Sequence, residues 1–156
     1  MIPAAVPSAV ADRFEATFAR IGLLVGAKQL GYNITAVPPG KRAFPYHSHR
    51  VNEEMFFVLQ GTGEVKIGAD TYPLRAGDIV ACLAGGPETA HQIINTGQEE
   101  LRYLAVSTQR APEIWEYPNS GKFGVIAEFA SPGGAQSAQF QHFGRVDESV
   151  GYWEGE

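Results

Sequence analysis

Five side chains that could bind a metal ion are concentrated in one short stretch and one later position. His47 and His49 are one residue apart, and Glu53 and Glu54 follow them. Because alternate residues of a β-strand point to the same face, we expect the two imidazoles to project together. Two imidazoles and a nearby carboxylate can supply three ligands to one divalent metal, and His91 is a candidate for a fourth. The residues therefore predict a mononuclear metal site.

The spacing around the histidine pair resembles the first characteristic motif of the cupin family. That motif is a glycine, a His-x-His pair, a glutamate and a closing glycine, met here by Gly40, His47, His49, Glu54 and Gly61. Six residues rather than five separate Gly40 from His47, whereas the six residues between Glu54 and Gly61 agree with the motif. The resemblance therefore selects Glu54 as the ligand, rather than its neighbour.

A second cupin motif is matched at its ends by Gly77, His91 and Asn95. Its middle differs, because Leu83 stands where the motif has proline and the stretch before His91 is longer than in the family. We expect this longer loop, residues 84–90, to line the mouth of a ligand pocket, since loops at barrel mouths govern ligand access.

The resemblance implies a divalent metal held by His47, His49, Glu54 and His91. Such a set leaves two open positions on an octahedral ion, which can take water, dioxygen or a chelating substrate. The ligand types suit Mn, Fe, Ni, Co or Zn and do not choose among them. Hydrogen bonds to the outer imidazole nitrogens would support the ligands, and Asn95 is a candidate for this role or for a turn.

Three classes of function are compatible with such a site, and the fold alone does not separate them. The first is a metal enzyme, either an isomerase acting on a chelated hydroxy-carbonyl compound or an Fe-dependent dioxygenase. The second is a small-molecule binding protein without turnover, and the third is a module whose metal stabilises the barrel. We favour an enzyme over a binder, although no residue stands out as a general base.

The elements that must position these residues are short strands separated by turns that contain glycine or proline. The predicted strands are residues 23–27, 30–37, 44–49, 54–59, 64–67, 71–74, 79–83, 91–95 and 101–107. Closely spaced strands without interleaved helices predict an all-β antiparallel fold. The resemblance makes this a double-stranded β-helix, the jelly-roll barrel of cupins.

We expect three regions along the chain. Residues 1–29 form an N-terminal arm with a short helix over 11–20 and the first strand, because Phe14, Phe18 and Ile21 have helical spacing. Residues 30–110 form the cupin barrel. Residues 111–156 form a C-terminal extension that packs on the barrel or on a partner. Within this extension a segment rich in Gly, Ser, Ala and Gln, residues 131–139, predicts a flexible linker.

The composition excludes several kinds of partner. The formal net charge of −5 argues against nucleic acid or an anionic membrane as the main partner. The single cysteine, Cys82, excludes an intrachain disulfide and is typical of a reducing cytosol. We find no signal peptide and no apolar run of about 18 residues that could span a membrane. These features predict a cytoplasmic protein with a small-molecule ligand.

The apolar strands further predict a homodimer. All residues of 55–59 are apolar, and Arg102 is the single charged residue of 101–106. Because a β-sandwich needs only one apolar face of each strand inside, the second face is available to a partner subunit. The N-terminal arm or the tail around Trp153 would cross over between the subunits.

Overall fold

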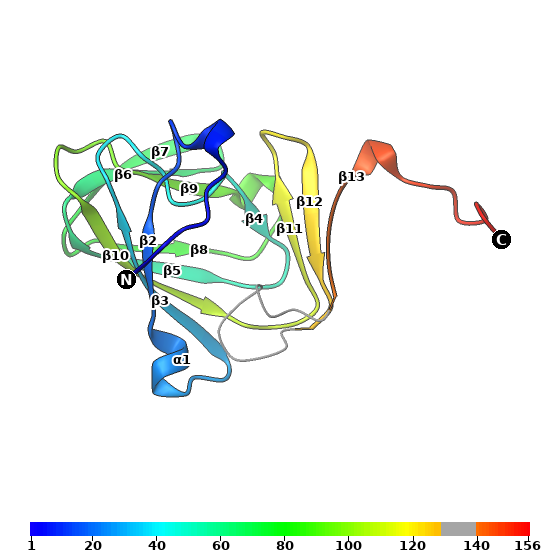
Figure 1. Ribbon diagram of the computed structural model, residues 1–156, viewed down its shortest axis with the longest axis horizontal. Coiled ribbons are helices and arrows are strands. Elements are labelled where there is room, and N and C mark those ends of the chain that lie inside the picture. Colours follow the sequence, from blue (N-terminus) through cyan, green and yellow to red (C-terminus); the bar gives the residue numbers. More distant parts are fainter. Residues whose placement is uncertain (129–139) are drawn as a thin grey trace.

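The computed structural model describes residues 1–128 and 140–156, which form antiparallel strands and very little helix (Figure 1). The predicted linker at 131–139 lies outside the described residues. The strands are β1 (Ile2–Pro3), β2 (Thr17–Arg20), β3 (Leu30–Val37), β4 (Ser48–His49), β5 (Glu54–Gln60), β6 (Thr62–Ile67), β7 (Asp70–Arg75), β8 (Ile79–Cys82), β9 (His91–Ile94), β10 (Leu101–Thr108), β11 (Glu113–Tyr117), β12 (Lys122–Ile126) and β13 (Gln141–Arg145). The helical elements are α1 (Ile21–Val25) and the 3-10 turns η1 (Ser8–Val10), η2 (Pro87–Thr89) and η4 (Val146–Glu148).

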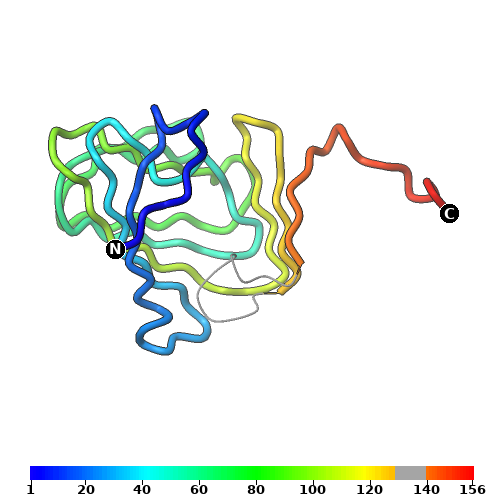
Figure 2. The backbone as a smooth tube through the Cα atoms, in the orientation of Figure 1, coloured from blue at the N-terminus to red at the C-terminus, as the bar shows by residue number. Residues whose placement is uncertain are grey.

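The strands form three sheets, of six strands (β1-β2-β3-β10-β5-β8), three strands (β7-β6-β9) and four strands (β13-β12-β11-β4). The six-stranded and three-stranded sheets share one hydrophobic core, to which the first contributes Phe56 and Tyr103 and the second contributes Val65 and Ile93. The four-stranded sheet lies at one end of this barrel, as the backbone trace shows (Figure 2). The predicted all-β jelly-roll architecture is confirmed.

The longest strands, β3 and β10, are antiparallel neighbours over their whole length, from Leu101↔Val37 to Thr108↔Leu30. Both are rich in residues that favour strands, and alternate side chains such as those of Leu101 and Tyr103 are buried. Strand β5 shows the same alternation, because Phe56 and Val58 are buried and lie on the same face as Glu54. This register directs Glu54, rather than Glu53, toward the barrel interior.

The turn after β5 shows why the closing residue of the first motif is a glycine. Gly61 has φ 82°, a left-handed conformation that side chains with a Cβ rarely adopt. A Cβ built at this position would also lie only 2.5 Å from the carbonyl oxygen of Glu100. Glycine therefore allows β5 to turn directly into β6 beneath the β9–β10 connection.

The N-terminal helix is not where the sequence predicted it. Residues 17–20 form β2, which pairs with β3 through contacts such as Phe18↔Thr35. The helix α1 instead covers Ile21–Val25, where a strand was predicted, and it ends at Gly26 with φ 72°. The predicted helix was wrong because strand pairing prevailed over a helical spacing carried by only three residues. In the described part of the chain, no helix is long and apolar enough to cross a membrane.

The C-terminal extension joins the barrel through β11, which pairs with β4. Strand β13 completes this sheet, and the chain then runs away from the barrel (Figure 1). The side chain of Trp153, which was expected to pack on the barrel or on a partner, is 78% exposed and contacts the ring of Tyr152. The division into regions 1–29, 30–110 and 111–156 stays a prediction, although β1 and β2 extend the same sheet as β3.

Candidate metal centre

The four predicted ligands converge at one point inside the barrel. Potential ligand atoms of His47, His49, Glu54 and His91 all lie within 4.8 Å of one another. Each of the three sheets contributes one of them, because His49 belongs to β4, Glu54 to β5 and His91 to β9. This cluster could hold a divalent metal ion.

The backbone fixes the two histidines that face each other across the cluster. The amide of His47 donates to the carbonyl oxygen of His91 at 3.2 Å, and the amide of His91 donates to that of His47 at 2.8 Å. His49 is held in β4 by its pairing with Trp115 of β11, and its carbonyl oxygen accepts a hydrogen bond from Gly85 at 2.8 Å. The imidazoles therefore project from a backbone that is hydrogen-bonded on both sides.

Protein acceptors orient the outer nitrogen of each imidazole. Nδ1 of His47 lies 2.8 Å from the carbonyl oxygen of Pro45, and Nδ1 of His91 lies 3.4 Å from that of Thr89. Because a carbonyl oxygen only accepts, Nδ1 is the donor in both contacts, and Nε2 has its lone pair available for a metal. Such outer hydrogen bonds fix the ring orientation and the tautomer of metal-binding histidines.

His49 is supported by Glu113, a buried carboxylate that the sequence analysis missed. One oxygen of Glu113 lies 3.5 Å from Nδ1 of His49. The carboxylate also accepts hydrogen bonds from the amides of Val51 (3.1 Å), Asn52 (3.0 Å) and Ile114 (2.8 Å), and a short one from the side chain of Asn52. These donors stabilise a negative charge in the interior, and the carboxylate in turn fixes the imidazole of His49.

The inner nitrogen of His49 shows that the cluster fits a metal. Both ring nitrogens of His49 are buried, and neither makes a hydrogen bond of normal geometry. Nε2 is 3.4 Å from an oxygen of Glu54, and the same oxygen is 2.9 Å from Nε2 of His91. A divalent cation bound among these atoms would satisfy the inner nitrogen and neutralise the carboxylate, which suits three imidazoles and one carboxylate.

The charges of the metal-free cluster follow from burial and from these contacts. Burial lowers the pKa of His49, but the carboxylates of Glu113 and Glu54 outweigh it and raise this pKa to about 9. Burial lowers the pKa of His47 to about 4, against the opposing effect of Glu54. Burial raises the pKa of Glu54, yet the neighbouring imidazoles of His49 and His91 hold it well below its ordinary value. A proton on His49 therefore takes the place of a cation near neutral pH.

A cavity of about 130 Å³ adjoins the cluster. Besides the four candidate ligands, its lining consists of Asn33, Thr35, Phe44, Phe56, Gln92, Ile93, Tyr103 and Ala105. The predicted role of the loop 84–90 was wrong, because no residue of this loop lines the cavity. The loop forms η2 and holds the residues beside it, since Gly85 donates to His49 and Thr89 accepts from His91.

Asn95 does not support an imidazole among the contacts that the structure describes. Its side-chain amide donates to the carbonyl oxygens of Val37 and Glu99, both at 2.8 Å. Its oxygen accepts from the amide of Gly97 at 2.9 Å. Asn95 therefore fixes the turn between β9 and β10, which was the alternative interpretation of this residue.

The structure is thus an antiparallel barrel with a partly buried His₃Glu cluster beside a small cavity. The family model of the cupin domain matches residues 33–107, which include all four candidate ligands. Residues 33–107 therefore match the cupin family.

Comparisons with other proteins add three relatives. A candidate sugar phosphate isomerase from Acidithiobacillus ferrooxidans is 26% identical, with a TM-score of 0.71 over 87% of this chain and 80% of that chain. A cupin sugar phosphate isomerase from Silicibacter pomeroyi has a TM-score of 0.78 over 95% of this chain and 88% of that chain, and at 24% identity it supports the fold alone. An oxalate-binding protein from Thermotoga maritima is 34% identical over 70 residues, which are 45% of this chain and 54% of the relative. The chain spans about half the length of the curated relatives it matches.

Proposed function

We propose that this chain is a metal-dependent isomerase that binds a small α-hydroxy-carbonyl compound through two neighbouring oxygen atoms. The observation that carries the proposal is the convergence of His47, His49, Glu54 and His91 within 4.8 Å, beside a cavity of about 130 Å³. Four protein ligands leave two adjacent positions on an octahedral ion, which suits a chelating substrate. When bound, the metal would act as a Lewis acid that polarises a carbonyl oxygen.

The substrate class that we propose is a sugar phosphate or a similar hydroxy-aldehyde. The support is the likeness to the candidate sugar phosphate isomerase from Acidithiobacillus ferrooxidans, which extends over 87% of this chain. Isomerisation moves one hydrogen between neighbouring carbon atoms and the hydroxyl proton from one oxygen to the other, and it needs no oxidant or reductant. A site with one metal and a small cavity therefore needs no redox partner for this reaction.

The other cavity residues would orient the substrate and exclude water. Asn33 and Thr35 project from the same face of β3 and offer hydrogen bonds to substrate hydroxyl groups. Burial raises the pKa of Tyr103, so that its hydroxyl keeps its proton near neutral pH and can donate to a substrate oxygen. The ring of Phe56 packs 5.6 Å from that of Tyr103 and helps to keep the reacting atoms away from water.

A second candidate function is the binding of a small dicarboxylate without turnover. Two observations favour it: the likeness to the oxalate-binding protein from Thermotoga maritima, and the absence of any further carboxylate or imidazole among the residues described around the cavity. A dicarboxylate such as oxalate could chelate the same two positions of the metal through one oxygen of each group.

The experiment that separates these functions uses protein loaded separately with Mn, Fe, Co, Ni and Zn. Each form is incubated with a panel of aldose and ketose phosphates, and interconversion is followed by NMR. The isomerase proposal expects turnover that disappears in Glu54→Gln and survives in Glu53→Gln. Binding of oxalate by calorimetry with no turnover of any panel member would support the second function. Oxygen uptake by the Fe form would instead indicate a dioxygenase.

A further inference from the structure

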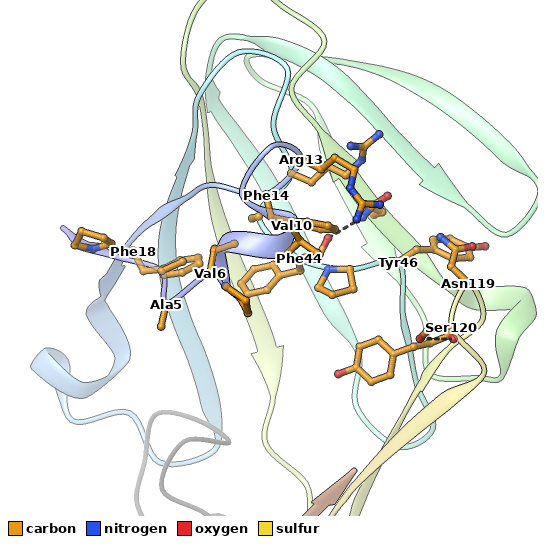
Figure 3. A pocket seen from close by; sticks show the side chains of 18 of the residues that line it. Ala5, Val6, Val10, Arg13, Phe14, Phe18, Phe44, Tyr46, Asn119 and Ser120 are labelled. Atoms are coloured by element: carbon orange, nitrogen blue, oxygen red, sulfur yellow. Dashed lines mark hydrogen bonds between the residues drawn. The ribbon is translucent and has the colours of Figure 1, made fainter. Parts of the chain in front are cut away.

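A second cavity, larger than the metal cavity, is a surface groove that lies beside the metal centre. It has a volume of about 960 Å³ and separates the N-terminal arm from the turn between β11 and β12 (Figure 3). Its apolar side is formed by the rings of Phe14, Phe18 and Phe44, and the last two stack with ring centroids 5.3 Å apart. Phe44 is 45% exposed, whereas Phe14 and Phe18 are partly buried, so the wall presents aromatic surface that a partner could cover.

The charges that line the groove are all positive. Its lining includes Arg13, Arg20, Arg42 and Lys122, and no aspartate or glutamate occurs among the lining residues of the described chain. This is the reverse of the whole protein, which carries a formal net charge of −5. The groove therefore fits an occupant that combines aromatic and acidic side chains.

The C-terminal tail, residues 146–156, has this combination. The described chain runs away from the barrel after β13, and the tail is exposed along its whole length (Figures 1 and 2). Tyr152 and Trp153 are 88% and 78% exposed. The tail contains four acidic residues, Asp147, Glu148, Glu154 and Glu156, and neither lysine nor arginine.

We propose that the C-terminal tail of one copy of this chain occupies the groove of a second copy. Tyr152 and Trp153 would pack against the aromatic wall, and the acidic residues on either side of them would pair with the cations of the groove. In a two-fold dimer each copy gives its tail and receives the other, so that the contact closes and no filament grows. The proposal goes beyond the proposed function and does not depend on it.

The area that such an exchange buries suits a stable dimer. A buried aromatic side chain removes roughly 150–250 Å² from solvent, so the four rings of two tails account for roughly 600–1,000 Å² before the groove surfaces are added. Together with the covered groove walls this reaches the range of specific interfaces, about 1,200–2,000 Å².

The exchange would also place the partner's tail over the metal cavity. Phe44 and Gln92 line both the groove and the cavity, so the two spaces adjoin. Tyr117 lines the groove and stacks on His47 with ring centroids 6.0 Å apart. The tail of a second copy would therefore cover the groove side of the cavity and restrict the ligands that reach it.

The first experiment measures the mass of the full chain by light scattering at micromolar concentration. We expect twice the chain mass for the native protein and a monomer for the double variant Tyr152→Ala/Trp153→Ala. The matched control is Leu24→Ala/Val25→Ala, which removes two exposed apolar side chains of α1 (85% and 67%) and should remain a dimer. A monomeric native protein, or a dimer that persists in the tail variant, overturns the proposal.

The second experiment tests whether the tail and the groove meet between copies. The groove variant Arg13→Glu/Arg42→Glu and the tail variant Glu154→Lys/Glu156→Lys should each weaken dimerisation at least about tenfold. An equimolar mixture of the two should recover a heterodimer, because each acidic segment then meets a basic one. Circular dichroism checks that both variants are folded. If the mixture forms no heterodimer, the exchange is contradicted.

Discussion

The metal cavity and the neighbouring groove are built in opposite ways. At the metal centre, the carboxylate of Glu113 lies beside the imidazole of His49 and is itself fixed by four hydrogen bonds. In the groove, Phe44 and Arg13 are exposed to solvent, and the volume of about 960 Å³ exceeds the 130 Å³ of the cavity. The metal centre is therefore preorganised for a small ion, whereas the groove is open and, in our proposal, is completed by the tail of a second copy of the chain.

This difference separates what single substitutions should do in each region. A preorganised site loses function when any one of its fixed groups is changed, because the remaining groups cannot rearrange. An open groove has many weak contacts, and its affinity depends on the sum of them.

The largest effect is expected for Glu54→Gln. This substitution removes the only negatively charged candidate ligand of the cluster, so metal affinity should fall by more than about 100-fold, the upper limit for loss of an outer partner. Elemental analysis of the purified protein measures the loss. Glu53→Gln is the matched control, because Glu53 is exposed and lies immediately before β5. Equal metal content in both variants would show that Glu54 is not a metal ligand, even though the register of β5 directs it into the barrel.

A smaller effect is expected for Glu113→Gln. The variant keeps the volume of the side chain but weakens the contact that orients His49, so metal affinity should fall about 10- to 100-fold. Glu116→Gln is the control on the same strand, because Glu116 pairs with Arg50 at 2.7 Å and is not in the cluster. Metal affinity is measured by competition with a chelator at a temperature at which both variants are folded. Equal affinity in the two variants would mean that Glu113 has a structural role alone.

The smallest effect concerns pH. The pKa of His49 is raised to about 9, so the metal-free protein carries a proton there at neutral pH, and a metal must displace it. Affinity should therefore rise about tenfold per pH unit between pH 7 and 8 and level off above about 9. His47, with a pKa of about 4, is already neutral in this range and adds nothing to the slope. A flat affinity from pH 7 to 9 would contradict the assigned charge of His49.

Much of the fold could be predicted because its strands carry strong local signals. The predicted strand at 30–37 coincides with β3, and those at 54–59 and 101–107 match β5 and β10 to within one residue. The four candidate ligands could also be proposed in advance, since three of them lie within eight residues and their spacing follows a known motif.

The features that were missed depend on contacts between distant residues. Glu113 lies 64 positions after His49, and nothing at that separation in the sequence links them. A local signal did exist, because Glu113 alternates with Trp115 and Tyr117 and must share their face of a strand. The position of α1 was missed for the same kind of reason, because the pairing of β2 with β3 determines where the helix can begin.

The location of the ligands on three separate sheets has a consequence for folding. Strand β4 has only two residues, and it is hydrogen-bonded to β11 and to the amide of Gly85, while the preceding residue His47 pairs with His91. In the metal-free chain, this corner should open locally before the rest of the barrel unfolds, and its amide hydrogens should exchange fastest among the strands of the site. An ion bound to all three sheets would act as a staple between them. At a concentration 1,000 times its dissociation constant it would stabilise the folded state by about 4 kcal/mol, and the corner would then unfold together with the barrel.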